Sequence, residues 1–305
     1  MEFTRRLKEA GFMDQNYVFM TDSDSDLPFH LKEEYDIPVV YMPYALNGKE
    51  YFDDLGQSLD FKSYYDAMRA GANPVTSALN EDAYLDYFTP VLEGGKDLLF
   101  VAFSSKLSST IQAVYSAREK LLKKYPGRKI TVVDTLSISG PMALLVLKAH
   151  EMYRAGKPME EVASWLENNK LRCQAFFTVD DLKYLKRGGR ISGAAAAVGT
   201  MLDLKPIIVE GSDGSLQAGE KIRGRKKALA YIVDAMMKCE PDPEESPIIV
   251  LNADAPEDAE RVKAAVEQRL PGARVLIEHV GPVIGAHAGP GTVALCFIGK
   301  EKRKP

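Results

Sequence analysis

The sequence predicts an α/β protein of two domains, with a parallel doubly wound (α/β/α) sheet in the first and a mixed sheet in the second. In the first half of the chain, continuous apolar runs alternate with helical patterns, which is typical of parallel strands buried on both faces. In the second half, an Asp-Gly turn at residues 213–214 separates two short strand patterns, which indicates antiparallel pairing. The length of 305 residues fits about two domains.

The first domain is expected over residues 1–170. Residues 1–14 are expected to form a short amphipathic helix that leads into the fold, and a helix over residues 159–170 closes the domain. The expected strands cover residues 17–20, 37–44, 98–103 and 130–133, and the helices between them cover residues 81–93 and 107–124.

The second domain is expected over residues 171–305. Its strand patterns are short and rich in β-branched and aromatic residues, and two amphipathic helices are expected to cover one face of the sheet. The expected strands cover residues 173–178, 205–210, 248–252, 273–277 and 293–298, and the helices cover residues 224–238 and 257–270.

The composition excludes several classes of protein. Hydrophobic residues make up 46% of the chain and charged residues 27%, which is typical of a folded globular protein. The net charge of −4 and the pI near 5.7 argue against nucleic acid as a partner. The three cysteines are too widely spaced to form a metal site, and no cofactor or metal is expected. Because the N-terminus is charged and the uncharged stretches are too short to span a bilayer, we expect a cytoplasmic protein.

Three aspartates follow the first expected strand, at Asp22, Asp24 and Asp26. A calcium loop is disfavoured because Leu27 stands where such a loop needs a glycine. The turn could supply the nucleophile of a stand-alone magnesium-dependent phosphotransferase or phosphohydrolase, with Asp22 or Asp24 in that role. The alternative, which we favour, is that these side chains cap backbone N–H groups. The Gly-Lys pairs of the chain lack the Ser or Thr of a nucleotide-binding loop, so a nucleotide must come from another protein.

Hydroxyl side chains gather where expected strands give way to helices. Thr76 and Ser77 form one such pair, and five hydroxyls in seven residues begin with Ser104 and Ser105. In a doubly wound sheet, ligands bind outside the carboxyl ends of the strands. Hydroxyls and free helix N–H groups at this edge can hold an anion, whereas capping alone explains one hydroxyl per turn.

Cationic and imidazole side chains mark three further segments. His287 lies among small residues in 285–291, which suggests close approach of the backbone to a ligand, although a lone histidine is more often structural. Arg190 follows a short helix that ends at a Gly-Gly pair. Arg223 and Arg225 belong to a run of five cations in residues 221–227. Cations at the start of a helix oppose its dipole and therefore indicate an anionic ligand or an acidic partner.

Together, these segments resemble the DegV family over residues 17–299. The resemblance rests on several motifs that occur in the order of the family. They are the Asp-rich turn after the first strand, Ser104-Ser105-x-Leu107-Ser108-x-Thr110, Tyr184-Leu185-Lys186-Arg187-Gly188-Gly189-Arg190-Ile191, Leu204-Lys205-Pro206-Ile207, Arg223-Gly224-Arg225-Lys226-Lys227-Ala228-Leu229 and His287-x-Gly289-Pro290-Gly291.

The resemblance implies a protein that binds a long-chain fatty acid between two α/β domains and is not an enzyme on its own. A separate fatty acid kinase would phosphorylate the carboxylate to an acyl phosphate, and transient contact with a membrane surface is compatible with such a role. The small-residue run 193–199 has little side-chain volume, so it could leave room for such an acyl chain, and close helix packing is the equal alternative. By resemblance, Thr76, Ser77, Ser104, Ser105 and His287 would hold the carboxylate, Arg190 would lie at the phosphoryl-transfer end, Arg223 and Arg225 would contact phosphate or partner, and no residue of this chain would be catalytic.

Overall fold

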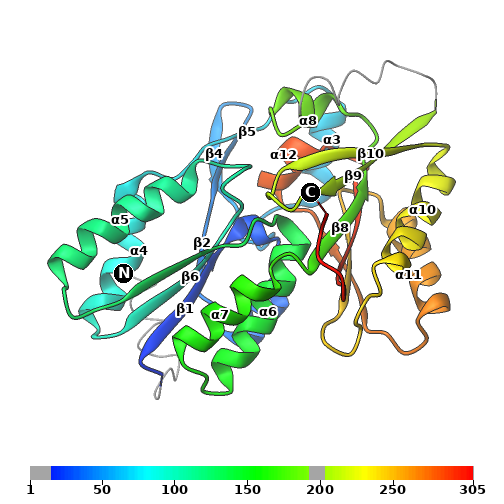
Figure 1. Cartoon of the computed structure of the whole chain (residues 1–305). Helices are drawn as coiled ribbons and strands as arrows, with labels where there is room; N and C mark the ends of the chain where they lie inside the picture. Colours follow the sequence, from blue (N-terminus) through cyan, green and yellow to red (C-terminus); the bar gives the residue numbers. More distant parts are fainter. Residues whose placement is uncertain (1–14, 192–202, 305) are drawn as a thin grey trace.

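Two large sheets lie side by side in the structure, with helices packed between them (Figure 1). The structure is a computed structural model that describes residues 15–191 and 203–304. The predicted α/β class, with a parallel sheet and a mixed sheet, is confirmed. The helix expected over residues 1–14 and the small-residue run 193–199 lie outside the described residues, and the domain boundary near residue 170 stays a prediction. Below, residues 15–170 are called the first half and residues 171–304 the second half.

The sheet of the first half is parallel throughout, in the strand order β2-β1-β6-β7. The chain starts in the middle, moves to one edge and then crosses to the other side, as in doubly wound folds. Every residue of β1 is buried, as expected for a strand covered on both faces. The strands are β1 (Tyr17–Asp22), β2 (Val39–Val40), β6 (Asp97–Ala102) and β7 (Ile130–Asp134).

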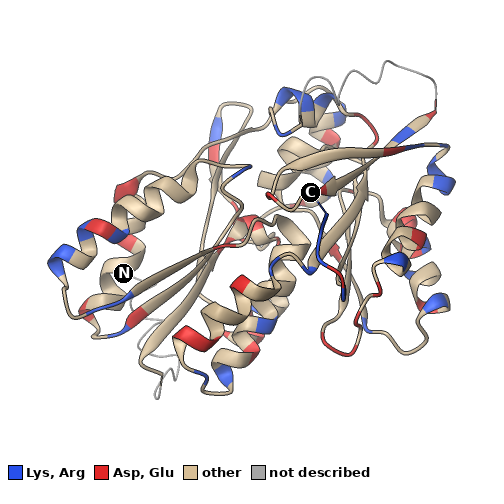
Figure 2. Ribbon diagram, viewed as in Figure 1, with Lys and Arg blue, Asp and Glu red and all other residues tan. Residues whose placement is uncertain are grey.

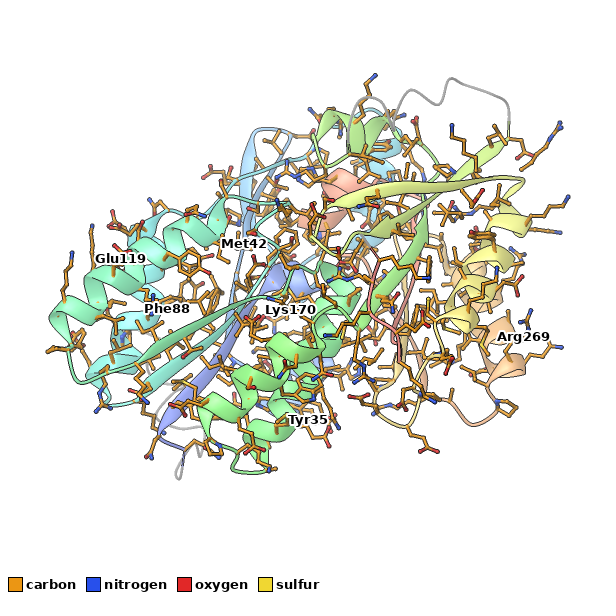
Figure 3. All side chains as sticks on the ribbon, in the orientation of Figure 1. Tyr35, Met42, Phe88, Glu119, Lys170 and Arg269 are labelled. Atoms are coloured by element: carbon orange, nitrogen blue, oxygen red, sulfur yellow. The ribbon has the colours of Figure 1, made fainter. Side chains whose placement is uncertain are left out.

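Helices cover both faces of this sheet because successive side chains of a strand point to opposite sides. Val18 and Met20 pack in one apolar cluster with residues of α4 (Glu81–Glu93) and α5 (Thr110–Lys124). Phe19 packs in another cluster with residues of α6 (Ser139–Arg154) and α7 (Met159–Asn169). Figure 3 shows Phe88 directed from α4 toward the sheet and Glu119 on the outer side of α5. α4 has the predicted bounds, and α5 begins three residues later than expected.

The sheet of the second half has the order β10-β9-β8-β13-β11-β12. Its pairs are antiparallel except for β11 and β12, which are parallel, so the predicted mixed character is confirmed. The predicted hairpin turn joins β9 to β10. The strands are β8 (Cys173–Thr178), β9 (Leu204–Glu210), β10 (Leu216–Arg223), β11 (Ile248–Asn252), β12 (Val275–His279) and β13 (Val293–Ile298).

Helix α6 (Ser139–Arg154) lies between the two sheets and was not expected from the sequence. Residues 139–146 are all buried, so the first two turns of the helix have no solvent face. A Cβ atom on Gly140 would lie 2.5 Å from the Cys296 sulfur, which shows how closely α6 approaches β13. α7 (Met159–Asn169) packs beside α6, while α10 (Arg225–Lys238) and α11 (Pro256–Arg269) cover the opposite face of the mixed sheet.

The prediction of a single strand over residues 37–44 is wrong, because the structure divides this segment between two sheets. β2 joins the parallel sheet, whereas β3 belongs to a small antiparallel sheet of order β4-β3-β5. Pro38 and Pro43 flank the division, and a proline has no N–H to continue a ladder. The small sheet consists of β3 (Pro43–Leu46), β4 (Lys49–Phe52) and β5 (Val75–Thr76).

The remaining helices are short and border the space between the two halves. They are η1 (Ser23–Ser25), α2 (Phe29–Tyr35), α3 (Phe61–Arg69), α8 (Lys183–Arg187) and α12 (Pro282–Ala288). Figure 2 shows that Lys, Arg, Asp and Glu residues are frequent on the outer helices, whereas the strands of the two large sheets are mostly made of other residues. Among the described residues, no helix has the length and apolar character needed to cross a membrane.

A buried ion pair fixes the C-terminal segment to the second sheet, and we expect its loss to destabilise the fold. Arg303 Nη1 lies 3.2 Å from Glu210 Oε2, and both side chains are almost fully buried. The Arg303→Met substitution would leave Glu210 buried without its cation, a change that typically costs about 3–5 kcal/mol. Urea unfolding at about pH 8 would measure the loss.

The Glu210→Gln/Arg303→Met double variant removes both charges and should recover part of the lost stability. Lys302→Met, at an exposed neighbouring position, is the matched control. Equal stability of Arg303→Met and Lys302→Met would contradict this account of the pair.

Candidate functional site

A cavity of about 270 Å³ lies where the two halves meet. The first half contributes the turn after β1, strand β5, the loop after β6 and the start of α6. The second half contributes β8, β13, α12 and the segment after α8. Most of the wall is apolar, and its larger side chains are Met42, Phe103, Leu107, Phe177, Leu216 and Ile284.

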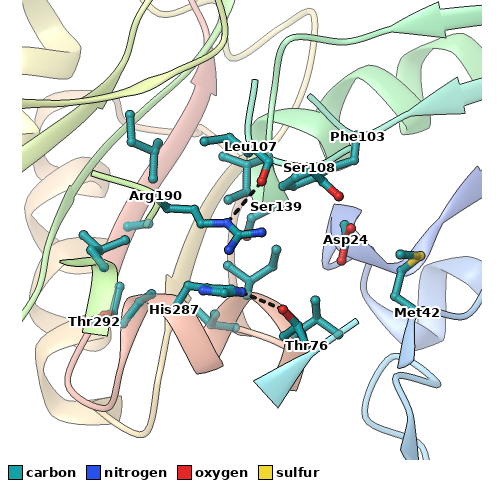
Figure 4. A pocket seen from close by; sticks show the side chains of 18 of the residues that line it. Asp24, Met42, Thr76, Phe103, Leu107, Ser108, Ser139, Arg190, His287 and Thr292 are labelled. Carbon is teal, nitrogen blue, oxygen red and sulfur yellow. Dashed lines mark hydrogen bonds between the residues drawn. The ribbon is translucent and has the colours of Figure 1, made fainter. Parts of the chain in front are cut away.

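Three polar side chains that lie far apart in the sequence come together on this wall. Arg190, His287 and Thr76 come from the segment after α8, from α12 and from β5 (Figure 4). Thr76 Oγ1 lies 2.8 Å from His287 Nε2, and Arg190 Nε donates to the Leu107 carbonyl oxygen at 3.1 Å. Both hydrogen bonds join the first half to the second. The polar cluster therefore depends on how the halves are docked.

His287 is a neutral imidazole in this setting. Burial lowers its pKa to about 4, and the nearby Arg190 and Arg187 act in the same direction. A neutral imidazole has one N–H donor and one acceptor nitrogen, so it can donate to an anion without carrying charge. A Cβ on Gly188 would lie 2.1 Å from His287 Nδ1, which explains why glycine stands at this position.

The turn after β1 places three buried carboxyl groups beside the cavity. Asp22 Oδ2 accepts from the Phe103 N–H at 3.2 Å, and Asp26 Oδ1 accepts from the Gly281 N–H at 2.9 Å, in line with the capping interpretation. Asp24 lines the cavity, and its Oδ1 has no hydrogen-bond partner among the described residues. Burial raises the pKa of Asp24 and of Asp26 to about 7.

The ionised form that a phosphotransferase nucleophile needs is disfavoured at Asp22. Burial, reinforced by the charge of Asp24, raises the pKa of Asp22 well above its usual range, so the nucleophilic ionised form is disfavoured. Within residues 15–191 and 203–304, no three His, Cys, Asp or Glu side chains are grouped so that they could hold a metal ion.

In the hydroxyl-rich loop after β6 (residues 104–110), some residues form hydrogen bonds within the fold and others line the cavity. Ser104 is fully buried and donates to the Gly214 carbonyl oxygen at 2.9 Å, and the Ser105 N–H donates to Asp134 Oδ1. Neither serine lines the cavity, whereas Ser108 and Ser109 do. The loop folds back on itself because the Ser104 carbonyl oxygen accepts from the N–H groups of residues 107 and 108. Ser77 lines the cavity beside Thr76.

The remaining predicted residues lie away from the cavity wall. Arg223 is exposed near the end of β10. Arg225 is the first residue of α10, and its guanidinium is engaged inside the fold. Its Nε donates to Asp258 Oδ2 at 2.7 Å and its Nη2 to the Gly291 carbonyl oxygen at 2.6 Å. Arg225 therefore supports the loop after α12.

Sequence reasoning did not identify Ser139 or the apolar wall contributed by α12 and β13. The position of Ser139 could have been inferred, because it follows β7 at the carboxyl edge of the parallel sheet, where ligands bind. Its hydroxyl donates to Asp26 Oδ2 and so fixes the start of α6 to the aspartate turn. The wall from α12 could not be inferred, because it depends on the docking of the two halves.

Comparisons with known proteins give a consistent result. The model of the DegV family, described as "Uncharacterised protein, DegV family", matches residues 17–300. A DegV domain-containing protein of Clostridium perfringens is 38% identical over 288 residues, which are 94% of this chain and 99% of that protein. These matches confirm the resemblance read from the sequence motifs.

Solved structures with the same fold include proteins named for fatty acid binding. A fatty-acid-binding DegV family protein from Thermus thermophilus is 31% identical, with a TM-score of 0.81, and the match covers 93% of this chain and all of that one. DegV of Bacillus subtilis, a fatty acid binding protein, is 26% identical, with a TM-score of 0.78, and the match covers 94% of this chain and 100% of that one.

The buried carboxyl group of Asp24 should make stability depend on pH. Because the pKa of Asp24 is raised in the folded protein, its contribution to stability is fully present below about pH 4, where the carboxyl group is protonated in the folded and in the unfolded chain. This contribution is lost as the pH rises to about 7. We therefore expect Asp24→Asn to stabilise the ligand-free protein, with a gain that grows from about pH 5 to about pH 8. The gain in the free energy of unfolding should not exceed ~1.4 kcal/mol for each tenfold difference between the acid dissociation constants of the folded and unfolded states.

Urea unfolding at these two pH values measures the gain. Asp86→Asn removes an exposed carboxyl group of α4 and serves as the control, with no pH-dependent gain expected. An equal effect of Asp24→Asn at both pH values would contradict the account.

Proposed function

Since this chain belongs to the DegV family, we propose that it binds a long-chain fatty acid with the acyl chain in the cavity between its two halves. The observation that carries this proposal is the combination of a mainly apolar wall with one cluster of hydrogen-bond donors, at Arg190, His287 and Thr76. The fatty acid binding named for the relatives from Thermus thermophilus and Bacillus subtilis supports it.

The apolar wall supplies the binding free energy. Burying each methylene of an acyl chain contributes ~0.8 kcal/mol, so a chain of about sixteen carbons gains on the order of 12 kcal/mol before the cost of association. Met42 before β3, Phe103 after β6, Phe177 in β8 and Ile284 in α12 come from four different segments of the chain and would surround such a chain. The space continues toward residues of the second sheet such as Ala294 and Cys296, whose small side chains leave room.

The donor cluster offsets the cost of burying a carboxylate. An anion in an apolar cavity is unfavourable unless its oxygens receive hydrogen bonds. Arg190 lines the cavity with a charged guanidinium whose Nη2 donates to no group among the described residues. Thr76 and neutral His287 can add uncharged donors. Ser108 and Ser109 line the cavity and can add further hydroxyl donors, whereas Ser104 and Ser105, which the sequence analysis proposed for this role, do not line it.

We further propose that the protein presents this carboxylate to a separate fatty acid kinase, which forms the acyl phosphate. The absence of a nucleotide-binding loop from the sequence supports a division of labour in which the partner brings the nucleotide. Exposed Arg223 is a candidate contact for an acidic partner surface, whereas Arg225 already pairs with Asp258. Transient contact with a membrane surface stays a prediction.

Removing two uncharged donors should weaken fatty acid binding. In the Thr76→Val/His287→Ala variant, the carboxylate would lose two hydrogen bonds, each of which contributes about 1.5–3 kcal/mol when one partner is charged. We expect the dissociation constant for palmitate, measured by displacement of a fluorescent fatty acid, to rise at least about tenfold.

Arg223→Ala removes a cation outside the cavity and serves as the control, with unchanged affinity. Circular dichroism would establish that both variants are folded. Unchanged palmitate affinity in the double variant would remove Thr76 and His287 from the carboxylate site.

Arg190 should matter more for phosphoryl transfer than for binding. A cation beside the carboxylate can stabilise negative charge that builds up during transfer, while the apolar wall still holds the acyl chain. We expect Arg190→Ala to bind palmitate but to yield little acyl phosphate with a purified fatty acid kinase and ATP, with hydroxylamine trapping of the product as the assay. Normal turnover with this variant would exclude Arg190 from the transfer step.

A further inference from the structure

Asp24 differs from its two neighbouring aspartates because it lines the cavity and they do not. Asp22 and Asp26 each accept a hydrogen bond from a backbone N–H group. Asp24 is only 3% exposed, lines the cavity, and leaves Oδ1 without a partner among the described residues. A buried polar atom without a partner is costly, so its retention points to a partner that arrives with the ligand.

Arg190 faces Asp24 across the cavity (Figure 4). The guanidinium donates to carbonyl oxygens of Leu107 and Gly188, and no carboxylate of the described residues forms an ion pair with it. Its charge still acts on Asp24, because it is the influence that lowers the pKa of that carboxyl group. A ligand carboxylate placed between the two side chains would therefore meet a cation on one side and a carboxyl group on the other.

We propose that Asp24 shares one proton with the carboxylate of the bound fatty acid, so that binding takes up a proton from solvent. This inference rests on the proposed function and assigns Asp24 a part in recognising the head group. The proton comes from water or buffer and joins Asp24, and no other bond forms or breaks. The bound pair of carboxyl groups then carries one negative charge, which the guanidinium of Arg190 balances.

Electrostatics requires this proton once two carboxyl groups occupy one apolar cavity. Like charges a few ångströms apart cannot both persist in a medium of low dielectric constant, so one of the two groups keeps a proton. A protonated Asp24 can also donate an O–H···O⁻ hydrogen bond, which is among the stronger hydrogen bonds of proteins. An ionised Asp24 would instead repel the ligand and compete with it for Arg190.

The other ionisable groups near Asp24 do not supply a second cation. Burial raises the pKa values of the carboxyl groups of Asp22, Asp26 and Asp53 above their usual range, which favours the neutral forms of these groups. His287 is neutral as well. The ionisable groups that interact with Asp24 or share its side of the cavity are Asp22 and Asp26 in the same turn, Asp53 after β4, Tyr84 on α4, Arg190 after α8 and His287 on α12.

The proton on Asp24 affects which head groups the cavity accepts and how easily an anionic phosphate can approach the bound carboxylate. The head group must be a hydrogen-bond acceptor that tolerates an acid beside it, which a carboxylate is and a cationic or purely apolar head group is not. In addition, the neutralised site would not repel an incoming anionic phosphate as strongly as two ionised carboxylates would. Affinity should fall as the pH rises, because taking up the proton becomes harder.

Isothermal titration calorimetry of the ligand-free wild-type protein with laurate measures the proton directly. Titrations at about pH 8 in two buffers of different ionisation enthalpy give the number of protons taken up, and we expect close to one per laurate. From about pH 7.5 to about pH 9 free laurate is already ionised, so we expect its affinity to fall by up to about tenfold per pH unit.

Asp24→Asn keeps the size of the side chain and removes its titration. In this variant we expect no proton uptake and a laurate affinity that no longer depends on pH, while Asp86→Asn should behave as wild type. Ordinary laurate affinity in the wild-type protein without proton uptake would overturn this inference and leave the proposed function intact. Failure of the wild-type protein to bind laurate at any pH would contradict the proposed function itself. If Asp24→Asn does not fold, the wild-type proton count still decides.

Discussion

Helix α6 must pack against two sheets at once, and the position of the cavity follows from this constraint. The first turns of α6 are buried on all sides, with Gly140 allowing close approach to Cys296 of the mixed sheet. Ser139, at the start of the helix, is fixed to Asp26 of the parallel sheet's first turn. Because one rigid element joins both sheets, the carboxyl edge of the parallel sheet is held opposite β8, β13 and α12. The space enclosed between these surfaces is the cavity.

The polar side of this cavity is assembled from groups that would be costly to bury alone. Arg190 and His287 reach the first half through hydrogen bonds to Leu107 and Thr76, so docking satisfies part of their hydrogen-bonding capacity. Arg190 Nη2 is left without a partner among the described residues, and Arg190 lines the cavity. The proposed fatty acid carboxylate would supply an acceptor for this guanidinium, which has only donors. Binding and the docking of the two halves are in this way expected to support each other.

The sequence predicted the regular parts of the fold because a continuous apolar run can be recognised as a buried strand without knowledge of its tertiary contacts. Strands β8, β11 and β13 have the predicted bounds. It missed α6, whose first two turns are buried on every side and therefore show no amphipathic period. Its motifs led to the predictions for Thr76, His287 and Arg190, which all line the cavity, and for Ser104 and Ser105, which do not line it. Which hydroxyl of a loop faces a ligand depends on backbone turns and on the opposite half of the molecule, neither of which is encoded locally.

The most direct test of fatty acid binding is mass spectrometry of an organic extract from protein purified without added lipid. The account predicts a long-chain fatty acid at close to one equivalent per chain, because a mainly apolar cavity with a cationic, hydrogen-bonding cluster should retain its ligand through purification. An extract without fatty acid, together with no uptake of added palmitate or oleate, would contradict the account.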